Sequence, residues 1–207
     1  MRSFIVSSLF LLLLNCQPNT KVNYVQLAKE LDSIMLEDQK FRLELSSFSF
    51  QNSKDSIKWK VMLNTQNKID SLNLLRIVEI IKEVGGYPGK TLVGDSASKV
   101  AFFVLQHSTP EIQKKHLDLI LKAAENFELN KSYAAMYHDR VLMHGGHPQI
   151  YGTQIRRETV FDSITGSWIE RRYIWPVQDT TIIDSLRLWN GLKPLEAYMY
   201  EMGLDIE

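Results

Sequence analysis

The sequence predicts a predominantly helical α+β domain with one small antiparallel β-hairpin region near its C-terminal third. Apolar residues recur at helical spacing over most of the chain up to Gly146, and glycine or proline separates these segments. After Pro148 the pattern changes to strand-like alternation. Because 44% of the residues are hydrophobic and 23% are charged, the chain is globular, and 207 residues suit one domain of ordinary size.

Charge and cysteine content exclude several classes of protein. The chain has 24 basic and 24 acidic side chains, so it lacks the overall basic character of most nucleic-acid-binding domains. Its basic residues around Arg156-Arg157 and Arg171-Arg172 are better interpreted as the face of a hairpin. A single cysteine rules out an intrachain disulfide and any zinc or iron–sulfur site with several cysteine ligands. We therefore expect no nucleic-acid partner.

The N-terminal residues predict where in the cell the protein is located. An apolar run, Phe4–Leu14, follows Met1-Arg2 and is about half of the roughly 20 residues that a membrane-spanning helix needs, which is typical of a signal peptide. The run ends in Leu13-Leu14-Asn15-Cys16, which resembles the lipobox of bacterial lipoproteins, although Asn15 stands where that pattern prefers glycine or alanine. An ordinary secretory signal with a coincidental cysteine is the alternative.

The lipobox implies three segments and a location. Residues 1–15 would be the signal peptide, residues 16–21 the lipidated Cys16 with a short spacer, and residues 22–207 a single α+β domain. Acyl chains on Cys16 would anchor the protein stably to a membrane, since each buried methylene contributes about 0.8 kcal/mol. We expect a lipoprotein of the cell envelope that faces the periplasm or the cell surface.

The helices are predicted from apolar spacing and from end signals. Leu27, Leu31, Ile34 and Met35 form the stripe of the first helix. Asp70 is predicted to cap a later helix that ends at Gly85-Gly86. The predicted helices cover 22–41, a segment around 59–63 after a polar stretch at 46–56, 71–84, a helix from Asp95 to His107, one that starts at Thr109-Pro110 and runs to about 127, and one from Asn130 to about 145.

The C-terminal third is predicted to contain strands and two short helices. Residues 149–154, 159–162 and 168–175 are rich in residues that favour strands, and residues 164–167 suit a hairpin turn. Pro176 ends this region. Short helices follow at 184–189 and 194–202.

Several polar residues lie on faces that are otherwise apolar. Asp38 continues the stripe of the first helix, and Arg42 lies four residues further on, where it can pair with the carboxylate. Asp139 shares a stripe with apolar residues and precedes Arg140. His107 lies at the C-terminal end of its helix, which favours a protonated imidazole. These residues suggest one polar pocket, although each has an ordinary structural explanation.

Several short motifs occur in a fixed order. Gln106-His107, Asp139-Arg140-Val141 and Gly146–Gln154 follow one another, and Asp38–Arg42 and Gly86–Gly89 precede them. The series resembles a bacterial domain family of unknown function, whose members share a QH, DRV and GxxQxYGTQ order with an upstream DQxxR. The resemblance covers roughly residues 36–195. It implies a site at these residues and supplies no reaction.

The residue types limit the chemistry. His138, His144 and His147 are close in sequence, but their spacing across a glycine break does not suit a metal site, so we expect no metal. The two Gly-Gly pairs follow helices, whereas a phosphate-binding glycine loop precedes one, and no serine lies in a nucleophile elbow. The only cysteine is assigned to lipid. We therefore expect no cofactor.

Three functions remain open. As an enzyme, the protein would use His107 as acid or base, with Asp38 or Asp139 orienting it, in a metal-independent hydrolase or transferase. As a binding domain, our preferred interpretation, it would recognise a small polar ligand or an envelope protein. As architecture, the same series would fix the hairpin on the helices. The predicted catalytic residues are His107, Asp139 and Asp38, and the predicted binding residues are Arg42, Arg140, Gln149, Tyr151, Thr153 and Gln154.

Overall fold

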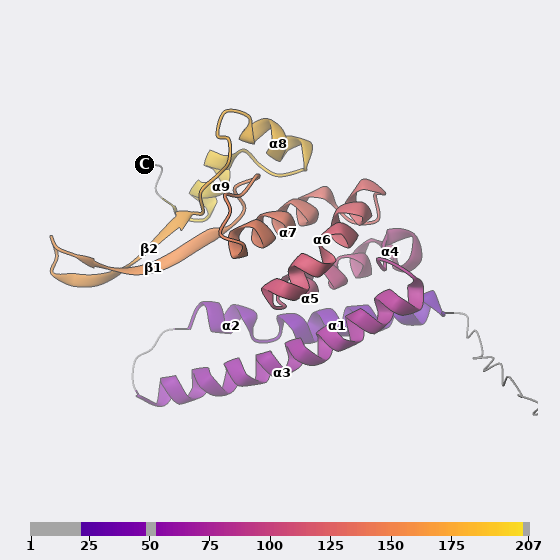
Figure 1. Cartoon of the computed structure of the whole chain (residues 1–207). Helices are drawn as coiled ribbons and strands as arrows, with labels where there is room; N and C mark the ends of the chain where they lie inside the picture. The colour runs from indigo at the N-terminus through magenta and orange to yellow at the C-terminus, as the bar shows by residue number, and fades with distance from the viewer. Residues whose placement is uncertain (1–21, 49–52, 205–207) are drawn as a thin grey trace, which may run out of the picture.

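The computed structural model describes residues 22–48 and 53–204, and it is predominantly helical with one two-stranded antiparallel sheet in the C-terminal third (Figure 1). The predicted fold class is confirmed. The predicted signal peptide, Cys16 and its spacer lie outside the described residues. The helices are α1 (Tyr24–Gln39), α2 (Arg42–Ser46), α3 (Ser53–Val84), α4 (Lys90–Ser98), α5 (Val100–Gln106), α6 (Pro110–Glu125), α7 (Lys131–His144), α8 (Ile183–Trp189) and α9 (Leu195–Glu201), and the strands are β1 (Ile155–Asp162) and β2 (Ser167–Ile174).

The elements stack in three groups, as Figure 1 shows: α1 to α3 on one side, α4 to α7 beside them, and the hairpin with α8 and α9 beyond α7. Helix α5 is the centre of the core, because six of its seven residues are buried. Helix α1 contributes Leu27, Leu31 and Ile34 to the same core, as its apolar spacing predicts. The Asn23 side chain caps α1 by accepting a 3.1 Å hydrogen bond from the Gln26 amide.

The segments predicted around 59–63 and at 71–84 are one continuous helix, α3. The prediction that Asp70 caps a helix is wrong, because Asp70 lies inside α3. Its carboxylate accepts hydrogen bonds from Arg42 and Gln66 instead of from a free helix end. Between the two predicted segments, Asn64, Thr65, Asn67 and Lys68 are exposed. One inward face nevertheless persists along α3 through Met62, Gln66, Asn73, Ile77 and Ile80.

The single helix predicted from Asp95 to His107 is two helices, α4 and α5, and α4 begins earlier, at Lys90. Gly94 has a φ of 82°, which interrupts α4. The first turn of α4 is capped from far along the chain: Glu128 Oε2 accepts a 2.9 Å hydrogen bond from the Thr91 amide. The local sequence carries no signal for this cap. The starts predicted for α6 at Thr109-Pro110 and for α7 at Asn130 are confirmed.

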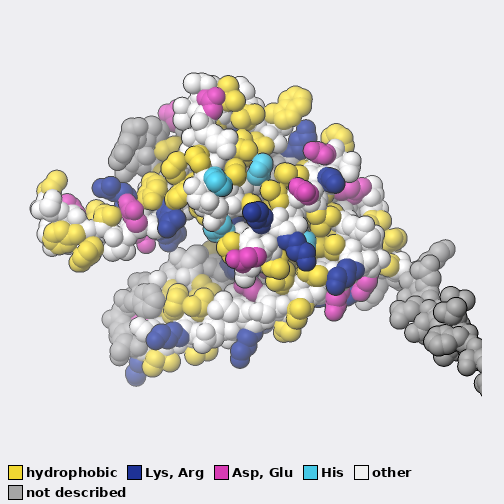
Figure 2. Space-filling model, in the orientation of Figure 1, with side chains coloured by type: hydrophobic (Ala, Val, Ile, Leu, Met, Phe, Trp, Pro, Cys, Tyr) yellow, Lys and Arg dark blue, Asp and Glu magenta, His cyan; other side chains and the backbone are white. Residues whose placement is uncertain are grey.

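The hairpin pairs β1 with β2 from Ile155 opposite Ile174 to Asp162 opposite Ser167. In Figure 2 the hairpin projects from the body of the protein. Phe161 and Trp168, which pair next to the turn, and Ile164 within the turn are exposed. The strand predicted at 149–154 is wrong. This segment is a loop, with one isolated bridge between Gln149 and Val177, because several of its amides turn toward Asp139. Helices α8 and α9 are confirmed close to their predicted positions.

Candidate functional site

The structure divides the predicted site residues into two groups. One is the His107 cluster, which we define as Asp38, Arg42, Gln66, Asp70 and His107. The other is the Asp139 loop, which we define as Asp139 with residues 149–154. Arg140 forms a hydrogen bond with neither group.

Asp38 is the centre of the His107 cluster. Its side chain is buried, and its Oδ2 lies 3.3 Å from His107 Nδ1. Arg42 binds both carboxylate oxygens, with Nε 3.2 Å from Oδ2 and Nη2 3.0 Å from Oδ1, so the pair predicted from the i,i+4 spacing is confirmed. Gln39 Nε2 donates a further hydrogen bond of 2.7 Å to Oδ2. The structure therefore places Asp38, rather than Asp139, beside His107.

Asp70 and Gln66 on α3 complete the cluster, and neither is among the site residues predicted from the sequence. Arg42 Nη2 also donates to Asp70 Oδ1 at 2.7 Å, so one guanidinium joins two carboxylates. Gln66 Nε2 donates to Asp70 Oδ1 and to the Asp38 carbonyl, at 2.7 and 3.0 Å. These bonds link the end of α1 to the middle of α3. The spacing of Gln66 and Asp70 at i,i+4 was the only sequence signal for them.

The electrostatics of Asp38 follow from its partners. Burial by itself raises the pKa of this carboxyl, but the hydrogen bonds from His107 and Arg42, together with their charges, outweigh burial and lower the pKa to about 2. Asp38 is therefore ionised at neutral pH and accepts hydrogen bonds only. His107 Nδ1 must carry a proton in this contact, so Nε2 is the ring nitrogen that has no hydrogen bond within the described residues.

His107 borders a pocket of about 260 Å³ between α3 and the end of α5. Asn67, Asp70, Ser71, Leu74, Val104, Ser108 and Thr109 form the rest of its wall. The His107 side chain is 19% exposed, and within the part of the chain that the structure describes its Nε2 makes no hydrogen bond. The arrangement can position an imidazole nitrogen against a small molecule, either to bind it or to exchange a proton with it.

Asp139 has a different environment. Its side chain is buried, and Oδ1 accepts hydrogen bonds from the amides of Ile150 and Tyr151 at 2.8 and 3.0 Å. Oδ2 accepts from the amide and the hydroxyl of Thr153 at 3.0 and 2.9 Å. The carboxylate thus folds the loop around itself. Within the described residues, Asp139 therefore forms no hydrogen bond with a histidine.

The predicted binding residues of the loop are also paired internally. Gln149 Oε1 accepts from the Gln154 amide at 2.8 Å, and Gln149 Nε2 donates to the Trp175 carbonyl at 2.6 Å. Gln154 Nε2 donates to the Met136 carbonyl and to Thr153 Oγ1. Gln149 is fully buried, and Gln154 is 4% exposed. These amides fix the loop between α7 and the hairpin, which corresponds to the architectural interpretation of the motif.

Arg187 on α8 holds the loop from the other side, and it is not among the site residues predicted from the sequence. Its Nη1 donates to the carbonyls of Tyr151 and Gly152 at 2.6 and 3.0 Å, and its Nε donates to Lys193. Gly152 has a φ of +65°, and a Cβ there would lie 2.9 Å from a methyl group of Leu195. The space that glycine provides is therefore taken up by α8 and α9, not by a ligand.

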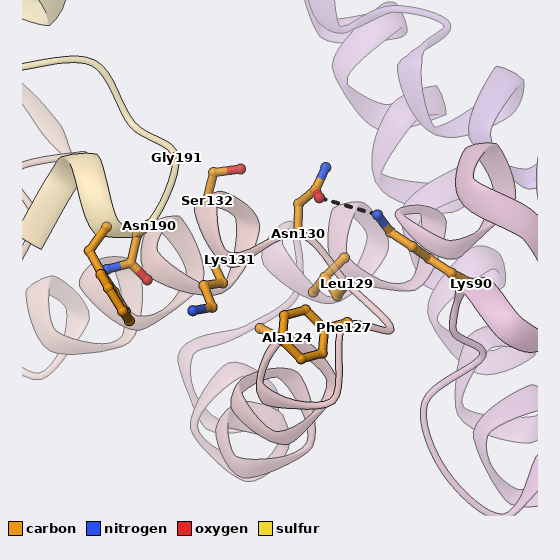
Figure 3. Close-up of a pocket in the computed structure, with 10 residues that line it drawn as sticks. Lys90, Ala124, Phe127, Leu129, Asn130, Lys131, Ser132, Asn190 and Gly191 are labelled. Carbon is orange, nitrogen blue, oxygen red and sulfur yellow. Dashed lines mark hydrogen bonds between the residues drawn. The ribbon is translucent and has the colours of Figure 1, made fainter.

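A separate pocket of about 400 Å³ lies away from both groups, where the α6–α7 connection meets the end of α8 (Figure 3). Lys90 donates a hydrogen bond to Asn130 at its edge. Lys131 lies 4.9 Å from the centre of the exposed Trp189 ring. No residue predicted from the sequence as a site residue lines it.

Two features are absent from residues 22–48 and 53–204. No group of three or more histidine, cysteine, aspartate or glutamate side chains in these ranges could hold a metal ion. None of the helices there combines the length and the apolar character that crossing a membrane requires.

Comparison with known proteins gives a family. No curated protein and no solved structure matches the chain significantly. One family model, described as a family of unknown function (DUF6624), matches residues 25–204, which is most of the chain. This range contains both the His107 cluster and the Asp139 loop. The chain therefore belongs to the DUF6624 family of unknown function.

Proposed function

We propose that this protein is a membrane-anchored lipoprotein whose domain binds a small polar ligand in the pocket beside His107. The observation that carries the proposal is the contact between His107 Nδ1 and the buried Asp38 carboxylate, which fixes the imidazole at the wall of an open pocket. His107 Nε2 makes no hydrogen bond within the described residues, so it can form one with a ligand.

The lining of the pocket supports a small polar ligand more than a protein partner. Ser71, Ser108 and Thr109 contribute hydroxyl groups, and Asn67 and Asp70 contribute an amide and a carboxylate. Such a set both donates and accepts hydrogen bonds, while Leu74 and Val104 supply apolar contact. At about 260 Å³ the pocket lies just below the range of about 300–1,000 Å³ that is common for ligand sites, so it suits a compact molecule.

The alternative is a metal-independent hydrolase or transferase at the same place. The Asp38–His107 contact favours it, because a carboxylate that holds Nδ1–H leaves Nε2 able to remove a proton from water or a substrate hydroxyl. In this case Asp38 stabilises the imidazolium after proton transfer, and Arg42 keeps Asp38 in place. Binding and catalysis thus use one pocket and differ in whether the ligand is consumed.

Ligand binding is tested by thermal shift of the full chain against a panel of sugars, amino acids, nucleosides and small hydroxy acids. We expect at least one compound to raise the melting temperature of the unmodified protein, and the effect to disappear in His107→Ala and in Asn67→Ala. His147→Ala is the matched control, because His147 is exposed and does not line the pocket. A compound that stabilises all three variants equally would contradict binding beside His107.

Mass spectrometry of that compound after incubation separates binding from catalysis. Under the binding proposal the compound is recovered unchanged. Under the alternative it is converted, and Asp38→Asn slows the conversion because the imidazole loses the carboxylate that orients it. Conversion at an undiminished rate in His107→Ala would contradict both functions at this pocket.

The anchor rests on the single Cys16 directly after the apolar run. Mass spectrometry of the protein purified from bacterial membranes should find lipidated Cys16 as the first residue of the mature chain. Cys16→Ser should leave the protein unprocessed and unlipidated. A mature chain that begins elsewhere, or carries an unmodified Cys16, would contradict the anchor without affecting the pocket.

A further inference from the structure

Two large aromatic side chains are exposed at the pocket drawn in Figure 3, which we name the Trp189 pocket. The lining residues that matter below are Phe127, Asn130, Lys131, Ser132, Trp189 and Asn190. Trp189 is the last residue of α8 and is 76% exposed, and Phe127 lies in the α6–α7 connection and is 77% exposed. Exposed rings forgo the stabilisation that burial gives, and two of them at one pocket indicate a surface that is free to bind a partner.

The backbone of Phe127 is unfavourable for a phenylalanine. Its φ is 61°, and no other non-glycine residue in the described ranges has a positive φ. Helix α6 ends here in a Schellman arrangement, in which the Phe127 amide donates to the Ala124 carbonyl at 3.2 Å. The Glu128 amide donates to the Ala123 carbonyl at 2.8 Å. Glycine is the usual residue at this left-handed position because a Cβ is strained there, and burial of the ring does not offset that strain in Phe127.

Contacts beside both rings hold them in defined positions. Next to Phe127, the Glu128 carboxylate accepts hydrogen bonds from the amide and the hydroxyl of Thr91 at 2.9 and 2.6 Å. At the other ring, Lys131 Nζ lies 4.9 Å from the centre of the Trp189 indole, which favours one orientation of that ring. Aromatic surfaces that are fixed before binding lose less freedom when a ligand arrives.

The polar groups of the same pocket offer both donors and acceptors. Asn130 Oδ1 accepts a hydrogen bond from Lys90, and Asn190 Nδ2 donates one to the Leu186 carbonyl. The other amide atom of each asparagine, and the hydroxyl of Ser132, make no hydrogen bond within the described residues. The pocket therefore presents an amide donor, an amide acceptor and a hydroxyl group to a ligand.

Exposed rings beside such polar groups suit a sugar. The C–H groups on one face of a pyranose ring pack against the negative face of an aromatic ring, and sugar hydroxyls both donate and accept hydrogen bonds. A phosphate-bearing ligand fits less well. Among the described residues no arginine lines the pocket, and Lys90 is already paired with Asp95 at 2.7 Å.

We propose that the Trp189 pocket binds a neutral sugar of one or two pyranose rings, packed against Trp189 and Phe127. Asn130, Ser132 and Asn190 bind its hydroxyl groups. The volume of about 400 Å³ lies within the range of about 300–1,000 Å³ that is common for ligand sites. Neither aromatic ring lines the His107 pocket, so the inference goes beyond the function proposed above and does not depend on it.

The test is a titration of the full chain by saturation-transfer NMR with maltose, cellobiose and N,N′-diacetylchitobiose. We expect saturable binding of at least one of these disaccharides. Trp189→Ala should weaken this binding at least tenfold, because it removes one of the two packing surfaces. Trp168→Ala is the matched control, since Trp168 is 71% exposed on the hairpin and does not line the pocket. His107→Ala should bind the sugar normally, which separates this site from the His107 pocket.

Phe127→Gly separates the role of the ring from the stability of the fold. Glycine relieves the left-handed backbone, so this variant should melt at the same or a higher temperature than the unmodified protein. It should nevertheless bind the sugar at least tenfold more weakly. A melting temperature that falls by several degrees would mean that the ring supports the fold, which contradicts its assignment to a ligand.

Three further results would overturn the proposal: no saturable binding of any of the three sugars, equal weakening by Trp168→Ala, or undiminished binding by both Trp189→Ala and Phe127→Gly. AMP is titrated in parallel as a ligand of another class that also combines a ring with polar groups. Binding of AMP that is tighter than that of every sugar, and that is lost in Trp189→Ala, would assign the pocket to nucleotides instead.

Discussion

The His107 cluster and the Asp139 loop each contain an aspartate that is completely buried, but the two aspartates have different partners. Asp139 binds the backbone of one loop, and the side chains around that loop bind each other. Asp38 binds side chains, and one of them, His107, lines an open pocket. The two carboxylates therefore differ in what they position. Asp139 holds a loop in place, whereas Asp38 orients a histidine that lines a pocket.

The comparison also separates the two halves of the motif series in this chain. The second half of the series, from Asp139 to Gln154, builds the connection between α7 and the hairpin. The first half, Asp38 with Arg42 and His107, lies at the pocket. Gln106, which precedes His107, has its Oε1 buried without a hydrogen-bond partner in the structure. Substitutions in the two halves should therefore affect stability to very different extents.

Asp139→Ala should have the largest effect. It leaves the amides of Ile150, Tyr151 and Thr153 without their acceptor, and each unpaired buried donor costs about 1–3 kcal/mol. We expect the free energy of unfolding to fall by about 3–5 kcal/mol in urea denaturation. Asp118→Ala, an exposed acid on α6, is the control and should change it by less than about 0.5 kcal/mol. A loss of under 1 kcal/mol in Asp139→Ala would show that the loop does not depend on this carboxylate.

Arg187→Met should have the next largest effect. Methionine fills the space of the aliphatic stem but leaves the carbonyls of Tyr151, Gly152 and Lys193 without their donor. Hydrogen bonds to a charged group contribute about 1.5–3 kcal/mol, and burial of the charge offsets part of their sum. We expect a loss of about 2–3 kcal/mol in urea denaturation, and a smaller loss in Arg187→Lys. An unchanged or increased stability in Arg187→Met would contradict the role of Arg187 in holding the loop.

Asp38 should make the stability of the protein depend on pH. Its folded pKa of about 2 lies below the ordinary value of 3.8, so the stabilisation is present above pH 3.8 and is lost as the pH falls toward 2. The shift corresponds to about 2 kcal/mol. The difference in unfolding free energy between the unmodified protein and Asp38→Asn should therefore shrink by about 2 kcal/mol between pH 6 and pH 2. Asp32→Asn, on the exposed side of α1, is the matched control, and a constant difference for Asp38→Asn would contradict the ionised pair.

His107→Ala should have the smallest effect on stability. The imidazole contacts Asp38, but that carboxylate keeps its hydrogen bonds to Arg42 and Gln39 when His107 is removed. We expect a loss of less than about 1 kcal/mol in urea denaturation. His116→Ala is an informative comparison, because His116 is only 8% exposed and should cost more. A loss above 2 kcal/mol in His107→Ala would place His107 among the architectural residues.

The sequence predicted well where local rules apply. The Asp38–Arg42 pair follows from i,i+4 spacing on one helix, and the position of His107 follows from the end of an apolar stripe. The starts of α6 and α7 and the hairpin were also correct. Each of these depends on residues that are close in the chain.

The parts that could not be predicted depend on distant partners. Asp70 looked like a helix cap because the sequence does not show that Arg42, 28 residues earlier, binds it. Alternating residue types predict a strand at residues 149–154. The segment is a loop because Asp139 binds it on one side and Arg187 on the other, and these tertiary contacts cannot be inferred from the local pattern.

The motif series thus divides into two halves: residues 139–154 hold the loop in place, and Asp38, Arg42 and His107 lie at an open pocket. The measurement that tests it most directly is the difference in unfolding free energy between Asp139→Ala and His107→Ala, determined by urea denaturation under one set of conditions. The different partners of Asp139 and His107 predict that Asp139→Ala is less stable by about 3 kcal/mol. Equal stabilities, or a less stable His107→Ala, would contradict the division.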